Sequence, residues 1–172
     1  MKEKSDEVVF AGYFSSPIGL LKIDGNDQFI TSIHFLDNDF VGDEQYQAND
    51  IIQECINQLK EYFEGHRKEF NLLLNPAGTE FQQRVWGKVS DIPYGETTSY
   101  GLIAKLLGDQ KLSRAVGLAN GANPIPIIIP CHRVVGNDGS LTGYAGGLDR
   151  KRWLLNHELS NTKISKGQLN LF

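Results

Sequence analysis

The 172-residue chain has little sulfur and no long apolar run. Its two cysteines, Cys55 and Cys131, are too few for a framework of disulfides, which predicts a reducing compartment and a cytoplasmic protein. No apolar stretch approaches the roughly 20 residues that a helix needs to cross a bilayer, so we expect no membrane partner. The charged segment at residues 1–7 leads directly into a strand-like segment and is not expected to be a signal peptide. These absences exclude secreted disulfide-rich proteins and membrane-spanning proteins.

The sequence also lacks a pattern of metal ligands. Its histidines, His34, His66, His132 and His157, stand far apart, and two cysteines cannot complete the ligand set of a structural zinc site. We therefore expect neither a metal nor a cofactor. Apolar residues make up 40% of the chain and charged residues 22%, a balance that is ordinary for a folded protein and excludes a disordered one.

Charge is divided unevenly along the chain. Residues 1–78 hold 6 Lys or Arg against 14 Asp or Glu, a net charge of −8, whereas residues 79–172 hold 11 against 7, a net charge of +4. This asymmetry points to an anionic partner for the second half, although a merely solvated surface would give the same pattern. A turn sequence at residues 75–78 coincides with the change in charge. We place a domain boundary there, between an N-terminal structural domain, residues 1–78, and a second domain, residues 79–172.

The first domain is predicted to be a sheet followed by a helix. Three segments rich in Val, Ile, Phe and Tyr, at residues 8–14, 19–24 and 29–35, are separated by turn sequences, which is typical of an antiparallel meander. Apolar residues then recur at helical spacing over residues 51–63, and Cys55 lies among them as a core thiol. The second domain is predicted to be mostly helical, so the expected fold class is α+β.

Two short helices in the second domain form a helix-turn-helix pattern. The first is predicted from the capping residue Ser99 to Gly108, and the second covers residues 113–121. The second helix has mostly small side chains, including two glycines that each cost about 1 kcal/mol relative to alanine. Either a partner approaches this backbone closely, or the helix packs tightly against a neighbouring helix. A small-residue face with one long side chain, Arg114, suits a narrow minor groove of DNA.

The chemical centre is expected around Cys131. Three prolines stiffen the apolar run at residues 123–130 and place the thiol at the end of a rigid, buried segment. A buried thiol is inert unless a base removes its proton, and the adjacent His132 can do so only if the segment turns. A carboxylate behind the imidazole would hold its tautomer, and Glu158 and Asp138 are the candidates. A buried cysteine beside an unrelated histidine would show the same pair.

The segment Pro130-Cys131-His132-Arg133-Val134 resembles the active-site signature of the O6-alkylguanine-DNA alkyltransferases. Six further motifs follow the order and spacing of that family, at residues 81–86, 92–100, 114–117, 123–124, 143–147 and 153–158. The resemblance is close over residues 79–159 and looser in the first domain, where the order of strands and helix is similar.

This resemblance implies a single-use DNA repair protein, a methylated-DNA–protein-cysteine methyltransferase. Cys131 takes the alkyl group from O6 of guanine, or less readily from O4 of thymine, and keeps it irreversibly as a thioether. His132 is the base and acts through a water, and Glu158 orients its imidazole. Tyr100 donates toward the purine. A monomer that acts on double-stranded DNA is expected.

The resemblance also implies how the damaged base is reached. The second helix of the helix-turn-helix enters the minor groove, the base turns out of the stack, and Arg114 fills the gap. Ala115 on the same helix contacts the DNA, and Lys111 contacts a phosphate.

Other residues are expected to form the pocket for the base. Asn123 ties the helix-turn-helix to the active-site segment. The backbone of Cys131, Val134 and Ala145 reads the base edge. The pocket loop includes Tyr144, Ala145 and Gly146.

The sequence departs from parts of the family pattern. Ala145 stands where some members carry serine, and Asn120 replaces a bulkier apolar residue, which leaves the accepted alkyl size open. Alkyltransferase-like proteins that bind lesions without repairing them lack the cysteine, whereas Cys131 is present. Two alternatives remain: a lesion-binding module without chemistry, and a Cys-His-Glu hydrolase that turns over.

Overall fold

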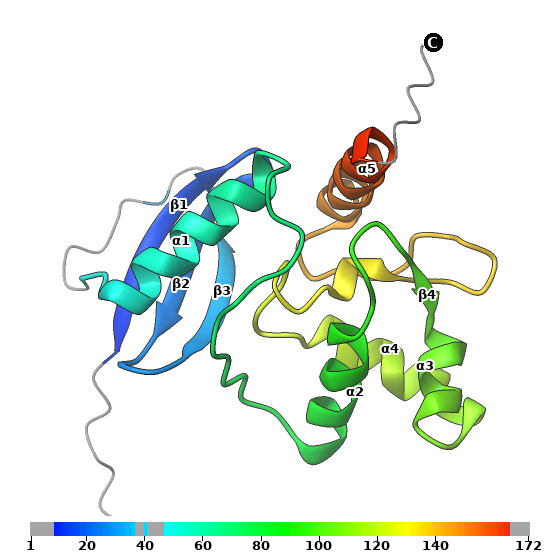
Figure 1. Cartoon of the computed structure of the whole chain (residues 1–172). Coiled ribbons are helices and arrows are strands. Elements are labelled where there is room, and N and C mark those ends of the chain that lie inside the picture. The colour runs from blue at the N-terminus through cyan, green and yellow to red at the C-terminus, as the bar shows by residue number, and fades with distance from the viewer. Residues whose placement is uncertain (1–8, 37–39, 41–46, 166–172) are drawn as a thin grey trace, which may run out of the picture. The chain divides into compact units, whose positions relative to one another are not determined.

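The structure is a computed structural model that describes residues 9–36, 40 and 47–165. The charged N-terminus, residues 1–7, lies outside this part. The chain forms two compact units, Met1–Ala77 and Gly78–Phe172 (Figure 1). None of the described helices is long and apolar enough to cross a membrane.

The first unit is an antiparallel sheet with one helix across it (Figure 1). Its elements are β1 Phe10–Ser16, β2 Gly19–Gly25, β3 Ile30–Leu36 and α1 Asp50–Phe63. Leu21 and Ile23 of β2 are fully buried and alternate with Lys22, which is partly exposed. Ile52 and Leu59 of α1 are buried as well. Burying each such side chain contributes about 1.5–3 kcal/mol, so sheet and helix stabilise each other.

The second unit is mostly helical. Its helices are α2 Glu80–Ser90, α3 Tyr100–Leu106, α4 Ser113–Gly121 and α5 Leu148–Ser165, with short 3-10 turns η1 Gln110–Leu112 and η2 Cys131–Arg133. Two-residue strands, β4 Thr98–Ser99 and β5 Val134–Val135, pair in parallel. The two units together confirm the predicted α+β fold class.

Side chains cap the first turns of α2 and α3, and Ser99 does so as the sequence predicts. Thr79 and Gln82 form a reciprocal capping box at α2, and Ser99 Oγ accepts a hydrogen bond from the Leu102 N–H at 3.1 Å at the start of α3. Trp86 of α2 donates from its indole N–H to the Ala119 carbonyl at 2.8 Å. This buried bond supports α4, the second helix of the helix-turn-helix.

The sequence pattern predicts a helical segment at residues 149–159, and that end is wrong, because α5 runs six residues further, to Ser165. The polar residues after Leu159 remain helical, and two of their side chains bond back to the preceding turn. Asn161 donates to the His157 carbonyl and Thr162 to the Glu158 carbonyl, both at 2.9 Å.

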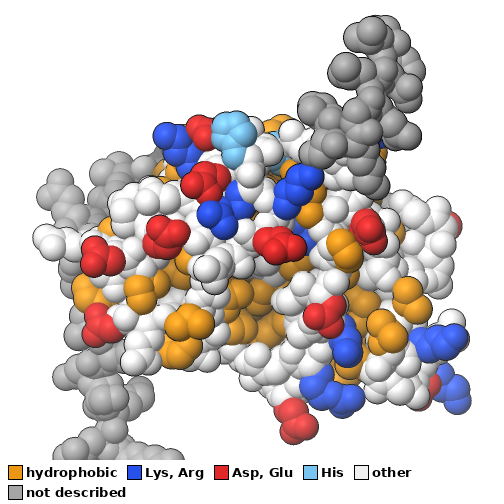
Figure 2. Space-filling view, viewed as in Figure 1, with side chains coloured by type: hydrophobic (Ala, Val, Ile, Leu, Met, Phe, Trp, Pro, Cys, Tyr) orange, Lys and Arg blue, Asp and Glu red, His pale blue; other side chains and the backbone are white. Residues whose placement is uncertain are grey.

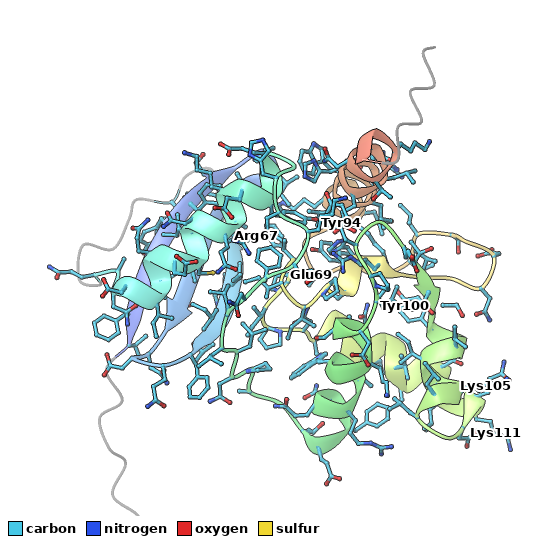
Figure 3. The ribbon with its side chains drawn as sticks, in the orientation of Figure 1. Arg67, Glu69, Tyr94, Tyr100, Lys105 and Lys111 are labelled. Carbon is cyan, nitrogen blue, oxygen red and sulfur yellow. The ribbon has the colours of Figure 1, made fainter. Side chains whose placement is uncertain are left out.

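Lys and Arg side chains gather at the end of the second unit that holds α3 and η1 (Figure 2). Lys105 and Lys111 point outward there (Figure 3). Leu102 and Leu106 of α3 are also exposed. This part of the surface combines positive charge with apolar area.

Candidate active site

Cys131 begins the 3-10 turn η2 and is 4% exposed. The Arg133 N–H donates to the Pro130 carbonyl at 2.9 Å, which closes the turn. The backbone therefore turns at the thiol, which an extended strand would not do. His132, the next residue, is fully buried.

The segment before Cys131 is held rigidly by Asn123. The Asn123 side chain donates to the Ile129 carbonyl at 2.8 Å and accepts from the Ile125 N–H at 3.0 Å. Ile127, between these points, has a φ of 75°, a conformation that β-branched residues rarely adopt. A tight, buried turn that follows α4 thus sets the position of the thiol.

His132 and Glu158 form a buried pair. The two side chains meet at 2.7 Å between His132 Nε2 and Glu158 Oε1, and both are fully buried. Arg133 donates two further hydrogen bonds to the same carboxylate, at 2.9 and 3.0 Å. The Gly95 N–H donates to it at 3.0 Å. Asp138, the other candidate, is exposed and accepts instead from the Ser140 N–H.

The electrostatics fix the tautomer of His132. Burial raises the pKa of Glu158, but the hydrogen bonds of His132 and Arg133 and the charge of Arg133 outweigh it and hold the pKa well below its usual range. Burial lowers the pKa of His132 and keeps its ring neutral. An ionised carboxylate only accepts, so Nε2 carries the proton and Nδ1 is the basic nitrogen. This buried Nδ1 has no hydrogen-bond partner among the described residues.

The thiol of Cys131 is protonated at neutral pH. Burial raises its pKa to about 11, whereas the Asn123 side chain and the Lys151 charge act in the opposite direction. A nucleophilic sulfur at this position therefore needs a base, and the unpartnered Nδ1 of the next residue is the candidate.

These pKa shifts predict a loss of stability in alkali. Burial raises the pKa of the Cys131 thiol from 9.0 to about 11 and that of Cys55 to about 12. At a pH between 9.0 and the folded-state pKa of each thiol, the unfolded chain has released the thiol proton and the folded chain still holds it. The free energy of unfolding therefore falls as pH rises above 9.0. The Cys131 part amounts to about 3 kcal/mol by pH 11 and is fully retained below pH 9.0.

Urea unfolding at several pH values, under reducing conditions, measures this loss. In Cys131→Ala the decline between about pH 9 and pH 11 should be shallower than in the wild type, by roughly the part assigned to one thiol. Equal declines in the two proteins would show that the Cys131 thiol is not shielded from water.

Lys151 is a site residue that the sequence analysis did not single out. It is fully buried, and its ammonium donates to the carbonyls of Val134 at 2.6 Å and Thr142 at 3.0 Å. It also approaches the Tyr100 hydroxyl at 3.4 Å. The signal was its spacing from Glu158, because residues seven apart share one face of a helix. Lys151 thus joins β5, the pocket loop and Tyr100.

We expect Lys151→Met to slow reaction of the Cys131 thiol about tenfold and to cost about 1–3 kcal/mol of stability. Methionine keeps the apolar length but removes the donor to two carbonyls and the charge that lowers the thiol pKa. The pH profile of thiol alkylation measures this effect and should move to higher pH. Lys163→Met, an exposed change on the same helix, is the control and should leave the profile in place.

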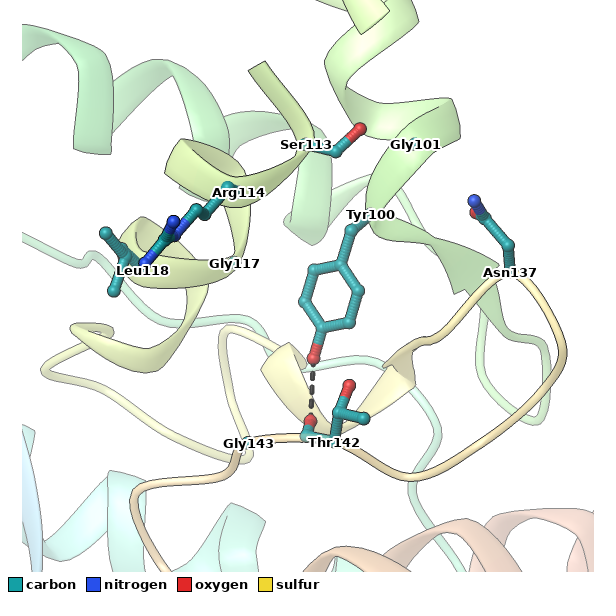
Figure 4. Close-up of a pocket in the computed structure, with 9 residues that line it drawn as sticks. All are labelled: Tyr100, Gly101, Ser113, Arg114, Gly117, Leu118, Asn137, Thr142 and Gly143. Atoms are coloured by element: carbon teal, nitrogen blue, oxygen red, sulfur yellow. Dashed lines mark hydrogen bonds between the residues drawn. The ribbon is translucent and has the colours of Figure 1, made fainter. Parts of the chain in front are cut away.

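A pocket of about 430 Å³ opens beside Tyr100 (Figure 4). One wall comes from α4 and the other from the segment after β5. The Tyr100 hydroxyl lies between them and donates to the Thr142 carbonyl at 2.8 Å. The lining residues are Tyr100, Gly101, Ser113, Arg114, Gly117, Leu118, Asn137, Thr142 and Gly143. Cys131 is not among them.

The other expected binding residues described next are not among the residues that line this pocket. Tyr144 has a buried hydroxyl, and nearby Cys131 contributes to raising its pKa, after burial as the main cause. Val134 is buried, whereas Ala145 is exposed and Gly146 is partly exposed. The Gly146 carbonyl accepts from Arg150 at 3.0 Å. Lys111, on η1, is exposed outside the pocket lining.

The glycines of α4 are not explained by packing within the protein. A Cβ on Gly117 would meet Tyr100 ring carbons at 3.7 and 3.9 Å, which is ordinary contact, and a Cβ on Gly121 would meet nothing within 4 Å. Tight helix packing, one of the two explanations considered, is therefore wrong for these positions. Together with Arg114 and Leu118 they occupy one outward face of α4, at spacings of three and four residues.

Among the described residues, no group of three or more His, Cys, Asp or Glu side chains could hold a metal ion. The predicted absence of a metal remains a prediction.

Comparisons with known proteins identify the family. The chain matches the models described as the ribonuclease-like domain and the DNA binding domain of 6-O-methylguanine DNA methyltransferase, over residues 9–76 and 80–160. A protein of Methanosarcina acetivorans named methylated-DNA–protein-cysteine methyltransferase is 46% identical over 153 residues, which covers 87% of this chain and 98% of that protein. A protein of the same name from Mycobacterium bovis is 48% identical over 147 residues, 84% of this chain and 89% of the relative.

Solved structures agree with these matches. The Mycobacterium tuberculosis O6-methylguanine methyltransferase superposes with a TM-score of 0.80 at 45% identity, covering 90% of this chain and 94% of that one. A structure of the M. tuberculosis protein in complex with DNA gives a TM-score of 0.78 at 46% identity, over 87% and 92% of the two chains. The names of these relatives define a class of proteins that transfer a methyl group from DNA to a cysteine, and the described part of the second unit holds one buried thiol, Cys131. The chain belongs to the O6-alkylguanine-DNA alkyltransferase family.

Proposed function

We propose that this protein repairs DNA by moving the alkyl group of O6-alkylguanine, and less readily of O4-alkylthymine, onto Cys131. The observation that carries the proposal is the buried His132–Glu158 pair, in which Nδ1 of His132 has no partner among the described residues and His132 follows Cys131, whose thiol is the only one in the described part of the second unit. His132 Nδ1 takes the thiol proton through a water, and the sulfur forms a bond to the alkyl carbon. The bond from that carbon to O6 breaks and leaves its electron pair on the base. The base takes up one proton, which balances the thiol proton that His132 removed, and leaves as guanine.

Tyr100 assists the leaving base in this proposal. Its hydroxyl proton is committed to the Thr142 carbonyl at 2.8 Å, so it must turn away from Thr142 to donate to the purine. The product is a thioether, which neither His132 nor water can cleave under mild conditions. Each chain therefore acts once.

We infer that α4 enters the minor groove of double-stranded DNA. Support comes from its outward face, where Gly117 and Gly121, which packing within the protein does not require, lie beside Arg114 and Leu118. Arg114 fills the place of the extruded base, with Ala115 beside it, and Lys111 contacts a phosphate. Affinity should therefore fall as salt rises. We propose a monomer in the cytoplasm, where Cys131 stays reduced.

Mass spectrometry tests the proposed reaction. The protein is incubated with a duplex that contains one O6-methylguanine, and its peptides are then weighed. One methyl group should appear on the Cys131 peptide and none on the Cys55 peptide, with no more than one lesion consumed per chain. DNA binding without a mass gain would favour a lesion-binding module. Consumption beyond one equivalent would favour a hydrolase.

Arg114→Ala should separate base extrusion from chemistry. Extruding a base costs a few kcal/mol, so loss of the residue that fills the gap should slow transfer from duplex DNA about tenfold or more. Reaction with the free O6-benzylguanine base should stay nearly unchanged, because it needs no extrusion. Comparing the two rates checks the assignment, and equal slowing of both would contradict it.

A further inference from the structure

Leu118 of α4 is 73% exposed, more than any other large apolar side chain among the described residues. It follows Arg114 by four residues and so lies one turn further along the same face of the helix. Both side chains line the pocket beside Tyr100 (Figure 4). A leucine that stays in water contributes little to the stability of the fold, so its apolar surface is available to whatever covers this face.

The outward face of α4 can make few hydrogen bonds. The exposed residues of this helix are Arg114, Leu118 and Gly121, and of these only Arg114 has a hydrogen-bonding side chain. Ser113 also lines the pocket, but its hydroxyl donates to the Gln110 carbonyl at 2.7 Å. Beyond Arg114, this face therefore meets a partner mainly through the apolar side chain of Leu118.

The charge around this face favours a polyanion as the partner. Residues 79–172 carry a net charge of +4, and Lys105 and Lys111 are exposed at the same end of the second unit (Figure 2). The proposed function puts α4 in the minor groove of duplex DNA, and the present inference rests on it. If Arg114 fills the place of the extruded base, Leu118 lies one turn away and faces the neighbouring base pairs.

The minor groove contains one group that a leucine cannot accommodate well. Every base pair presents acceptors there, whereas only a G·C pair adds a donor, the 2-amino group of guanine. Leucine accepts no hydrogen bond, so a 2-amino group that it covers loses water and gains no partner. We propose that Leu118 determines a preference for sequence context, with faster transfer when A·T pairs flank the lesion than when G·C pairs do.

The test compares two duplexes that differ only in this group. Each contains one O6-methylguanine, and the two base pairs on either side of it are G·C in one duplex and hypoxanthine·C in the other. Hypoxanthine lacks the 2-amino group and keeps the major-groove edge of guanine. The rate of methyl transfer to Cys131 is measured for each duplex under single-turnover conditions, and the ratio of the hypoxanthine rate to the guanine rate is taken.

Leu118→Ala separates groove reading from the strength of the duplex. Hypoxanthine·C pairs have one hydrogen bond fewer, which eases extrusion for every protein variant alike. The ratio in the wild type should therefore exceed the ratio in Leu118→Ala by about fivefold, the effect of one donor left without a partner. In Leu118→Gln, whose side-chain oxygen can accept from the 2-amino group, the ratio should fall below that of Leu118→Ala.

Two controls show that the effect belongs to the groove. Leu73→Ala changes an exposed leucine of the first unit and should keep the wild-type ratio. Reaction with the free O6-benzylguanine base should be nearly unchanged in both Leu118 variants, because a free base involves no groove.

Equal ratios in the wild type and Leu118→Ala would overturn the inference and leave the proposed function standing. So would a ratio in Leu118→Gln as high as that of the wild type. Failure of the wild type to take a methyl group from either duplex would instead overturn the proposed function, and this inference with it.

Discussion

Replacing Cys131 with alanine should abolish methyl transfer and leave binding to lesion-containing DNA within about twofold of the wild type. Alkyl transfer needs a sulfur nucleophile, and the described part of the second unit has no other. The substitution removes one small buried atom, so α4 and the pocket should keep their geometry. Peptide mass analysis measures transfer, and fluorescence anisotropy with labelled duplex measures binding.

Cys55→Ala is the matched control. Cys55 is also a buried thiol, its pKa is raised by burial to about 12, and it lies on α1 in the first unit. Transfer should proceed at the wild-type rate in this variant. Methylation that persists in Cys131→Ala, or stops in Cys55→Ala, would contradict the assignment of the acceptor.

Glu158→Gln should have two large effects. The neutral amide no longer fixes His132 with its proton on Nε2, so transfer should slow about 10²- to 10⁴-fold. Arg133 also loses the carboxylate that balances its buried charge, which should cost about 3–5 kcal/mol of stability. The rate is measured in single-turnover reactions below the melting range, and stability is measured by urea unfolding.

A double variant separates these two effects. Glu158→Gln combined with Arg133→Met removes both charges, so much of the stability should return while the rate stays low. If the rate returned together with the stability, Glu158 would serve the fold and not the orientation of His132. A single variant Glu158→Gln with the wild-type rate would lead to the same conclusion.

Much of the fold could be predicted because local signals agreed with one another. The sheet strands, α1 and the capping box at Thr79 follow from short-range patterns that tertiary packing did not override. The pairing of β4 with β5 could not be predicted, because two-residue strands are too short to show a periodicity. It nevertheless matters, since the register of Thr98 with Val134 connects the start of α3 with the end of the active-site turn.

The candidate site was predicted less completely than the fold. Cys131 and His132 are adjacent in sequence, and Glu158 was one of two carboxylates considered, but sequence spacing could not decide between it and Asp138. The decision depended on which side chain points inward, and that is set by how α5 packs. The sequence analysis did not single out Lys151, because a charged side chain is rarely fully buried.

The tight enclosure of Cys131 has a consequence for the spent protein. At 4% exposure the sulfur has little free volume around it, so a methyl group that stays there must displace neighbouring atoms. Inserting one carbon into a packed interior costs about 1–3 kcal/mol. We therefore expect a chain that has reacted to be less stable than a fresh one, to unfold more often, and to be degraded sooner by proteases.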